Sequence, residues 1–283
     1  MSSRHHLVIV TGANRGFGAS IAHSYVKHSG ASSVSFVLVG RDKQGLDTVL
    51  SELKHSVNTS NNHVAVKGTV VANVDLADIS ILDDSLARIH AAAAQLRTEA
   101  AQSNSAITKS VLFNNAGSLG DLGKTTKEVT WQDARRYFDF NVVSFVGLSS
   151  TFLKETQAAF PNDQYPQHQT VIVNISSLLA VQPFSNWGLY ATGKAARDRL
   201  LGVVALEEKE NNVKTLNYAP GPLDNMMQAD VRRTLGDKEQ LEIYEDMHQK
   251  GSLVAMDDSS RKLVLLLEKD EFASGGHIDF YDE

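Results

Sequence analysis

Hydrophobic and polar positions follow two alternating patterns along most of the chain. Short, nearly continuous apolar runs are typical of parallel strands buried on both faces, and they predict strands at 7–10, 34–39, within 64–74, and at 111–113, 171–175, 213–216 and 277–280. Apolar residues with helical spacing predict helices at 17–28, 46–55, 79–97, 131–156 and 190–208. This alternation predicts an α/β fold, a doubly wound parallel sheet (Rossmann fold) in three layers.

Three stretches depart from this pattern. The polar stretch 56–62 predicts a surface loop, and 91–104 predicts a helix that runs past the sheet and then a loop. Residues 222–251 follow the sixth predicted strand and are polar with helical patches, so we expect them to cover a substrate. We find no internal repeat and no domain boundary, and residues 1–283 therefore predict a single domain.

Composition narrows the classes of function. The 283 residues are 42% hydrophobic, which is ordinary for a globular protein. The chain has no cysteine, which excludes disulfides, cysteine nucleophiles and thiolate metal sites and fits a reducing compartment. A net charge of -6 argues against nucleic-acid and anionic-membrane partners, and no apolar run approaches the roughly 18 residues of a membrane span. The histidines lack metal-ligand spacing, and we expect His5 and His6 at a solvated terminus.

A glycine-rich turn directly follows the first predicted strand. Its three glycines have the spacing Gly-x-x-x-Gly-x-Gly, and a helical pattern begins at once after them. Glycine allows a sharp turn and a close approach of the backbone to a pyrophosphate, and a helix start directs free N–H groups at it. This context favours a dinucleotide site over a glycine-rich turn without a ligand. We expect the cofactor to contact Gly12, Asn14, Arg15, Gly16, Phe17 and Gly18.

The end of the second predicted strand indicates which dinucleotide binds. In this fold an acidic residue there holds the ribose 2′-hydroxyl, whereas an arginine accommodates a 2′-phosphate. Arg41 precedes Asp42, and Arg15 supplies a second guanidinium, so NADP is favoured over NAD. The alternative is a solvated Arg41 with Asp42 on the ribose. Asp75 and Leu76 are expected beside the adenine, and an N-cap of the next helix is an equal alternative for Asp75.

Reactive side chains follow the fourth and fifth predicted strands. Tyr190 and Lys194 share one helix face at i and i+4, and Ser177 precedes Tyr190 by thirteen residues. An ammonium beside Tyr190 is expected to lower its pKa from about 10, so that Tyr190 exchanges a proton with a carbonyl oxygen. Ser177 is expected to hydrogen-bond that oxygen, and Lys194 also to bind the nicotinamide ribose.

Two further segments belong to this candidate site. Asn115, Ala116 and Gly117 follow the fourth strand and let the chain pass close to a cofactor; the alternative is an ordinary loop turn. Asn141 is expected to hold a water that links Lys194 to solvent, and the alternative is a polar residue that bends a helix.

These motifs resemble the short-chain dehydrogenase/reductase family over nearly the whole chain. Further stretches resemble the sepiapterin reductase branch of that family, at 16–18, 114–121, 174–178, 182–184, 194–198, 216–224, 267–272 and 279–282. The resemblance implies an NADPH-dependent oxidoreductase that reduces side-chain carbonyls of a pterin, in the closing step of tetrahydrobiopterin synthesis. It also implies a cytoplasmic homodimer.

The resemblance further implies residues that bind substrate and cofactor. It places Asp279 on the pterin ring, where a carboxylate can accept from an amino group and a ring N–H; the alternative is a surface acid in an acidic tail. It also implies Leu178 and Gly221 beside the substrate, and Leu223, Asn225 and Met226 beside the cofactor. Many family members have threonine where Asn225 stands. Two other functions stay open: a reductase of small diketones or other carbonyls, and a non-catalytic NADP-binding regulator.

Overall fold

A seven-stranded parallel sheet forms the centre of the protein, in the order β3-β2-β1-β4-β5-β6-β7. The computed structural model describes residues 4–56 and 64–282. Its strands are β1 His5–Thr11, β2 Ser33–Val39, β3 Ala65–Val71, β4 Ile107–Asn114, β5 Gln169–Ile175, β6 Val213–Ala219 and β7 His277–Asp279. The strand order reverses between β1 and β4, and ligands of doubly wound sheets bind at the carboxyl ends beside such a reversal.

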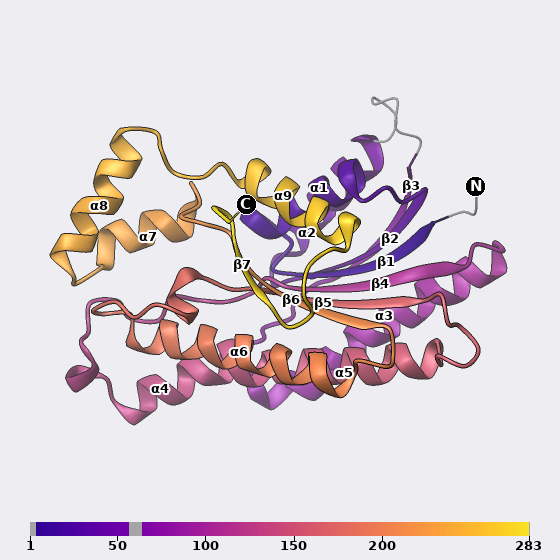
Figure 1. Ribbon diagram of the computed structural model, residues 1–283, viewed down its shortest axis with the longest axis horizontal. Helices are drawn as coiled ribbons and strands as arrows, with labels where there is room; N and C mark the ends of the chain where they lie inside the picture. Colours follow the sequence, from indigo (N-terminus) through magenta and orange to yellow (C-terminus); the bar gives the residue numbers. More distant parts are fainter. Residues whose placement is uncertain (1–3, 57–63, 283) are drawn as a thin grey trace.

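Helices cover both faces of this sheet (Figure 1). One face carries α1 Gly16–His28, α2 Lys43–Ser56 and α9 Met256–Lys269, and the other carries α3 Leu82–Gln102, α5 Ser144–Ala159 and α6 Gly188–Glu207. The helix α4 Trp131–Phe138 precedes α5, and α7 Met226–Thr234 and α8 Lys238–Gln249 extend beyond one end of the sheet. The predicted three-layered α/β fold is confirmed.

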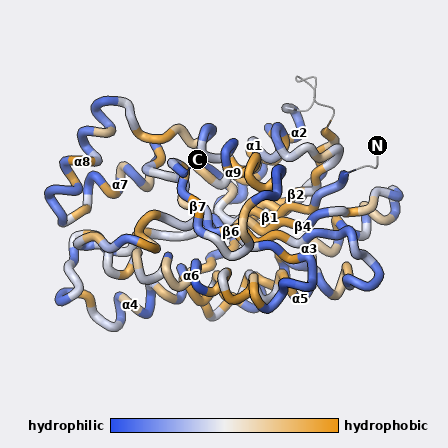
Figure 2. Tube along the Cα trace, in the orientation of Figure 1, coloured by the Kyte–Doolittle hydropathy of each residue, from blue (hydrophilic) through white to orange (hydrophobic). Residues whose placement is uncertain are grey.

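Alternate residues of each strand feed two separate cores. Val8 of β1 and Phe113 of β4 pack under α1 and α9, whereas Ile9 and Leu112 pack against α3 and α5. Figure 2 shows this apolar centre, with more hydrophilic residues along α8. Burial on both faces explains why the strands read as continuous apolar runs.

The first strand begins earlier than its apolar run predicts. His5 and His6 lie inside β1 and are each 1% exposed, so the expectation of a solvated terminus is wrong. The His5 ring nitrogens bond to Ser105 and Ser35, and Nδ1 of His6 bonds to the Tyr25 hydroxyl at 3.0 Å. These hydroxyl partners satisfy the two imidazoles, so that both can be buried in the strand. Because histidine is polar, the apolar pattern does not include the first two residues of β1.

The predicted helix 131–156 is interrupted. A π-helical turn, η3 Asp139–Val143, separates α4 from α5, and such turns frequently mark functional sites. The helix expected to run past the sheet is confirmed, because α3 continues to Gln102. Most of the expected polar loop at 56–62 lies outside the described residues. Among the helices of 4–56 and 64–282, none combines the length and apolarity that a membrane crossing requires.

Candidate active site

The turn between β1 and α1 requires its glycines. Gly12 and Gly16 have φ values of 65° and 59°, in the left-handed region that favours glycine. A Cβ atom on Gly18 would lie 2.3 Å from the carbonyl oxygen of Gly12, so a larger residue there would displace backbone. The glycines therefore allow a tight turn, in which no side chain from these positions covers the first N–H groups of α1.

The start of α1 offers unsatisfied donors to a ligand. The residue before the helix, Arg15, makes no side-chain capping hydrogen bond, so the first N–H groups have no intrahelical acceptor. Asn115 fixes the turn to β4, because its Nδ2 donates to the carbonyl oxygens of Thr11 at 2.9 Å and Gly12 at 3.3 Å. A glycine cradle at a helix N-terminus fits the pyrophosphate of a dinucleotide.

Two cations stand at the expected adenosine end. Arg15 and Arg41 are exposed, and neither guanidinium has a hydrogen bond or ion pair with another described residue. Asp42 is also exposed, and the side chain of Asn14 lies against Gly40 and Gly45. Both guanidinium groups are therefore available to an anionic ligand such as a 2′-phosphate.

The residues expected beside the adenine have local roles. Asp75 accepts a hydrogen bond from the N–H of Ala77 at 3.0 Å, and the next helical turn is capped by Asp78. The N-cap alternative for Asp75 is therefore wrong, because the helical turn starts at Ile79, four residues after the acid. Leu76 is buried, and so is Phe17 of the glycine turn.

Ser177, Tyr190 and Lys194 meet beyond the carboxyl end of β5. Ser177 begins the turn η4 Leu178–Ala180, where its Oγ accepts from the N–H of Leu179 at 3.3 Å, and its hydroxyl lies beside the side chain of Tyr190 in the first turn of α6. The Lys194 Nζ lies 5.4 Å from the centre of the Tyr190 ring and donates to the carbonyl oxygen of Ile175 at 2.6 Å. The i and i+4 spacing therefore gives the shared face that the sequence predicts.

The expectation that Lys194 lowers the pKa of Tyr190 is wrong in this structure. Burial raises the pKa of Tyr190 to about 12, and the Ser177 hydrogen bond and the charge of Arg197 oppose it only in part. Burial, and then the charge of Arg197, holds the pKa of Lys194 well below its usual value. The neutral phenol is thus the stable form at pH 7, which suits a proton donor.

Asn141 lies in the π-helical turn and binds the loop after β4. Its Oδ1 accepts from the N–H of Ser118 at 2.8 Å, and its Nδ2 donates to Ser118 Oγ and to the carbonyl oxygen of Tyr137, each at 3.0 Å. The break in the predicted helix falls at this residue. Asn141 therefore positions the loop 115–118 beside the site, and its expected water stays a prediction.

The C-terminal residues complete this edge of the sheet. Asp279 pairs with Ala219 at the end of β6, and its Oδ1 accepts from the N–H of Tyr281 at 3.0 Å. Gly221 has a φ of 76° and lies against Phe280. The Asn225 side chain caps α7 by accepting from Gln228 N–H at 2.9 Å, an acceptor role that leaves its amide N–H groups available.

Three flanking residues differ in exposure. Leu223 is buried and bridges to Val254, whereas Leu178 and Met226 are exposed, at 43% and 69%. The exposed pair stands at the site edge, so a bound ligand would find apolar surface there.

The family comparison decides how this geometry is understood. The family model of the short chain dehydrogenases matches residues 6–236. The chain belongs to this family. As a short-chain dehydrogenase it is an NAD(P)-dependent oxidoreductase, and the family assignment made from the motifs is confirmed.

Several relatives of this short-chain dehydrogenase span its full length. The sepiapterin reductase of Xenopus tropicalis is 38% identical over 98% of this chain and 96% of its own length, and that of Rattus norvegicus is 37% identical over 97% and 95%. A benzil reductase of Bacillus cereus is 27% identical over 95% and 96%. The solved L-sorbose reductase of Gluconobacter frateurii is 18% identical, has a TM-score of 0.71 over 98% and 95%, and supports the fold.

Arg197 is a member of the site that sequence reasoning missed. It is 2% exposed, lies one turn beyond Lys194 and donates to the carbonyl oxygens of Asn114 at 2.7 Å and Ala116 at 3.4 Å. Its guanidinium stacks 4.5 Å from the centre of the Phe145 ring. The i and i+3 spacing from Lys194 was the available signal. Arg197 joins the catalytic helix to the loop that approaches the cofactor.

The segment 222–251 packs against the catalytic helix. Trp187 lies 5.3 Å from Tyr190 and 6.4 Å from Tyr244 of α8, centre to centre, and its Nε1 donates to Gln240 at 3.1 Å. The N–H of Gly236 donates to the carbonyl oxygen of Leu122 at 2.9 Å. The segment is therefore docked beside Tyr190 by aromatic and polar contacts.

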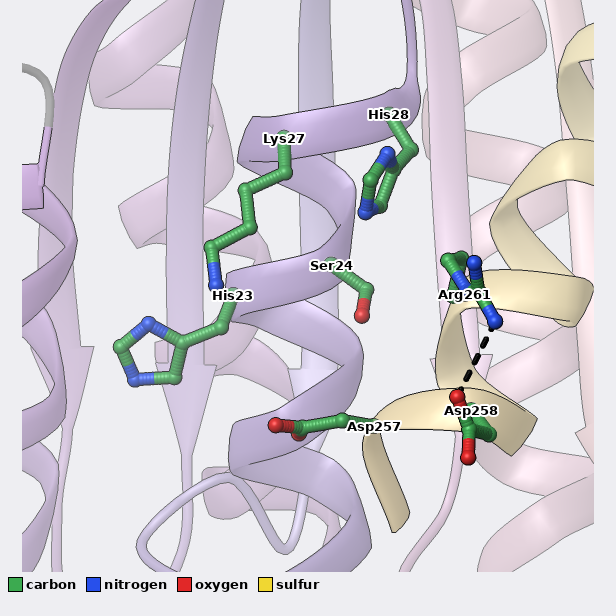
Figure 3. Close-up of a pocket in the computed structure, with 7 residues that line it drawn as sticks. All are labelled: His23, Ser24, Lys27, His28, Asp257, Asp258 and Arg261. Carbon is green, nitrogen blue, oxygen red and sulfur yellow. Dashed lines mark hydrogen bonds and ion pairs between the residues drawn. The ribbon is translucent and has the colours of Figure 1, made fainter. Parts of the chain in front are cut away.

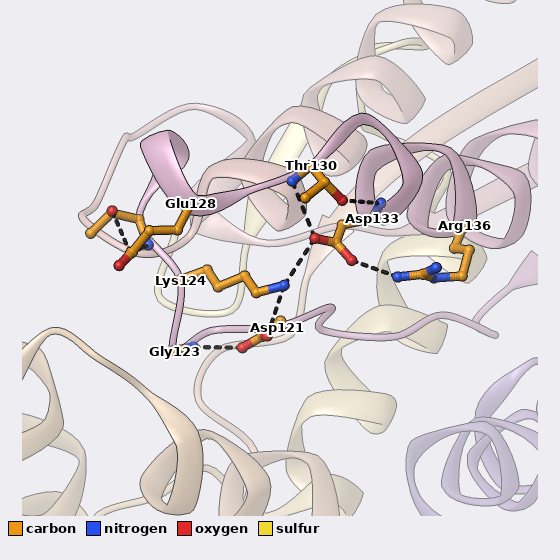
Figure 4. Close-up of polar contacts among 8 residues, drawn as sticks. Asp121, Gly123, Lys124, Glu128, Thr130, Asp133 and Arg136 are labelled. Atoms are coloured by element: carbon orange, nitrogen blue, oxygen red, sulfur yellow. Dashed lines mark hydrogen bonds and ion pairs between the residues drawn. The ribbon is translucent and has the colours of Figure 1, made fainter.

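The loop that carries Leu122 is itself ordered by charge. Lys124 bridges Asp121 at 3.6 Å and Asp133 at 2.9 Å, and Arg136 also binds Asp133 (Figure 4). The side chain of Thr130 caps α4 by accepting from the N–H of Asp133. This network holds the loop at the position where it meets α7 and α8.

A separate cleft of about 300 Å³ lies between α1 and α9 (Figure 3). It is lined by His23, Ser24, Lys27, His28, Asp257, Asp258 and Arg261. It contains none of the residues assigned to catalysis or cofactor binding, because it lies along the helices and not at the carboxyl ends of the strands.

Proposed function

We propose that this protein is an NADPH-dependent carbonyl reductase that acts on pterin side-chain ketones, as a sepiapterin reductase. The observation that carries the proposal is the meeting of the Ser177 hydroxyl, the Tyr190 phenol and the Lys194 amine at one place. Sequence identity of 36–38% to known sepiapterin reductases along nearly the full chain supports the substrate class.

The chain's own groups suit the proton half of such a reduction. Bound NADPH supplies a hydride to the carbonyl carbon. Tyr190 Oη donates a proton to the carbonyl oxygen, and the hydroxyl of Ser177 hydrogen-bonds the same oxygen and stabilises its developing charge. Lys194 orients the cofactor ribose, and Asn141 leads a water toward Lys194. The raised pKa keeps Tyr190 protonated at pH 7, which favours reduction.

The choice of NADP over NAD rests on unused cations. Arg15 and Arg41 lie exposed near the glycine turn without an internal partner among the described residues. A 2′-phosphate would pair with both, whereas a 2′-hydroxyl would leave both unpaired. Asp42 would hold the ribose of NAD, but it comes after Arg41, which is the first residue beyond Gly40.

Asp279 is the proposed anchor of the pterin ring. It stands at the carboxyl end of β7, on the strand face that His277 turns toward α6, the helix that carries Tyr190. The segment 222–251 covers the substrate in this proposal, because α8 docks on Trp187 beside Tyr190.

A reductase of small diketones is the second candidate, favoured by the benzil reductase relatives at 25–27% identity. NADPH consumption with sepiapterin, benzil and a panel of aliphatic diketones separates the two. We expect the highest kcat/KM with sepiapterin, and Asp279→Ala should lower it at least tenfold while benzil turnover stays within about twofold. Equal effects on both substrates would overturn the pterin anchor. Absence of turnover with every carbonyl would favour the non-catalytic regulator.

A homodimer also belongs to this proposal. Four apolar side chains are exposed, at 39–78%: Val143 at the end of η3, Val146 of α5, and Val203 and Leu206 of α6. The helices α5 and α6 lie side by side on one face (Figure 1). Exposed apolar side chains on adjacent helices suit a subunit contact. Sedimentation of Leu206→Glu beside the unmodified protein tests it. A cytoplasmic location stays a prediction from the family resemblance.

A further inference from the structure

The strand that carries Asp279 is weakly held by its own backbone. β7 has three residues, whereas its neighbour β6 has seven, and it forms one edge of the sheet. Its flanking backbone bonds run from Asn217 N–H to Gly276 at 3.0 Å and from Phe280 N–H to Ala219 at 2.8 Å. A short edge strand opens more readily than a central one, so the position of Asp279 needs a further attachment.

A side-chain pair supplies that attachment. Nδ1 of His277 donates to Oδ2 of Asp198 at 2.7 Å, which joins β7 to α6. Oδ1 of the same carboxylate accepts from Ser176 Oγ at 2.6 Å and from Asn174 Nδ2 at 2.8 Å. One carboxylate therefore links β7, the end of β5 and α6.

The same carboxylate is in register with the catalytic residues. Asp198 follows Tyr190 by eight residues and Lys194 by four, so the three stand on one face of α6. Ser176 directly precedes Ser177. Asp198 therefore lies on the helix that carries Tyr190 and contacts the residue next to Ser177.

We propose that Asp198 and His277 form a positioning pair, which holds the substrate anchor Asp279 at a set distance from Tyr190. The inference rests on the proposed function, in which Asp279 binds the substrate ring. The pair touches neither the cofactor nor the reacting atoms. It acts through the placement of β7, so its loss weakens substrate binding more than the chemical step.

The charges around the pair give it a pH dependence. The hydrogen bond to Asp198 raises the pKa of His277 above its usual value, with Asp279 and Asp282 adding to this effect, and burial opposes it. Nε2 of His277 is buried and has no hydrogen-bond partner among the described residues, so burial lowers the pKa of His277 and opposes the effect of Asp198. From α6, the cations near Asp198 are Lys194 and Arg197. The ion pair is complete below the raised pKa of His277 and is lost as the pH rises through it.

Two variants at position 277 and one control variant test the pair, with KM and kcat for sepiapterin measured from pH 6 to pH 9. Unmodified enzyme should show KM rising with pH while kcat follows a separate profile. His277→Leu should raise KM about tenfold at pH 6 and change kcat less than about threefold. His277→Asn keeps an uncharged donor at the Nδ1 position, so its KM should not depend on pH and should match that of the unmodified enzyme at high pH, where His277 is neutral. His55→Leu, an exposed position on α2, is the control.

Hydrogen exchange of residues 277–282 gives a readout without substrate. His277→Leu should speed exchange of these amides at least about tenfold, and His277→Asn should restore protection. Unchanged exchange in His277→Leu would overturn the positioning pair, as would equal losses in KM and kcat. If exchange rises as expected while Asp279→Ala leaves KM unchanged, the pair holds β7 but the proposed anchor fails, and positioning of the substrate is then refuted.

Discussion

The buried histidines of the sheet predict an acid-sensitive fold, and His6 is the sharpest case. It is 1% exposed in β1, and burial, followed by the charge of Lys109, lowers its pKa to about 3. The unfolded chain binds a proton near pH 6.5, whereas the folded chain excludes it until much lower pH. Stability is therefore complete above pH 6.5 and falls as the pH drops toward 3.

The magnitude follows from the difference in proton binding. Between pH 7 and pH 5, His6 should cost about 2 kcal/mol of unfolding free energy, at about 1.4 kcal/mol for each pH unit below 6.5. His168, whose pKa burial lowers to about 4, should cost a similar amount. Together they remove a large share of the 5–15 kcal/mol that is typical of a domain.

Urea unfolding at pH 7 and pH 5 measures this cost by difference. His6→Gln cannot take up the proton, so its loss of stability between the two pH values should be about 2 kcal/mol smaller than that of the unmodified protein. His248→Gln, at an exposed position of α8, should match the unmodified protein. The same pH slope in His6→Gln and in the unmodified protein would refute the reasoning.

Two further predictions concern the cofactor turn. Gly18→Ala should weaken NADPH binding at least tenfold and lower the free energy of unfolding by about 1–3 kcal/mol, because its Cβ would meet the Gly12 carbonyl. Gly202→Ala is the control in α6, where a Cβ meets open space, and it should raise the melting temperature. Equal melting temperatures for the two variants would contradict this. Arg41→Ala should raise the Kd for NADPH about tenfold or more and leave that for NADH nearly unchanged, as measured by fluorescence titration; equal losses would exclude the 2′-phosphate contact.

The sequence predicts the fold because its two periods differ. Each buried strand reads as an apolar run and each helix as a 3.6-residue pattern, which is sufficient for the sheet and its layers. The exceptions share one cause. His5 and His6 extend β1 with polar side chains whose partners come from Ser35, Ser105 and Tyr25, distant in sequence. No local pattern contains those partners.

The candidate site was predictable in its membership and not in its electrostatics. Spacing predicted that Tyr190 and Lys194 meet, since i and i+4 residues share a helix face, and Ser177 joins them because it follows the carboxyl end of β5. The direction of the Tyr190 pKa shift depends on burial and on Arg197, which tertiary packing decides. The π-helical turn at Asn141 was likewise not predictable, because the turn contains no glycine or proline and Asn141 bonds to Ser118, which is distant in sequence.

Proton donation by Tyr190 during NADPH-dependent carbonyl reduction is the central claim, and Tyr190→Phe tests it most directly. The substitution removes one hydroxyl and keeps the ring that packs on Trp187. With sepiapterin as the substrate, kcat should fall about 10²–10⁴-fold, while the Kd for NADPH stays within about twofold. NADPH oxidation that continues at the unmodified rate in Tyr190→Phe would contradict the account.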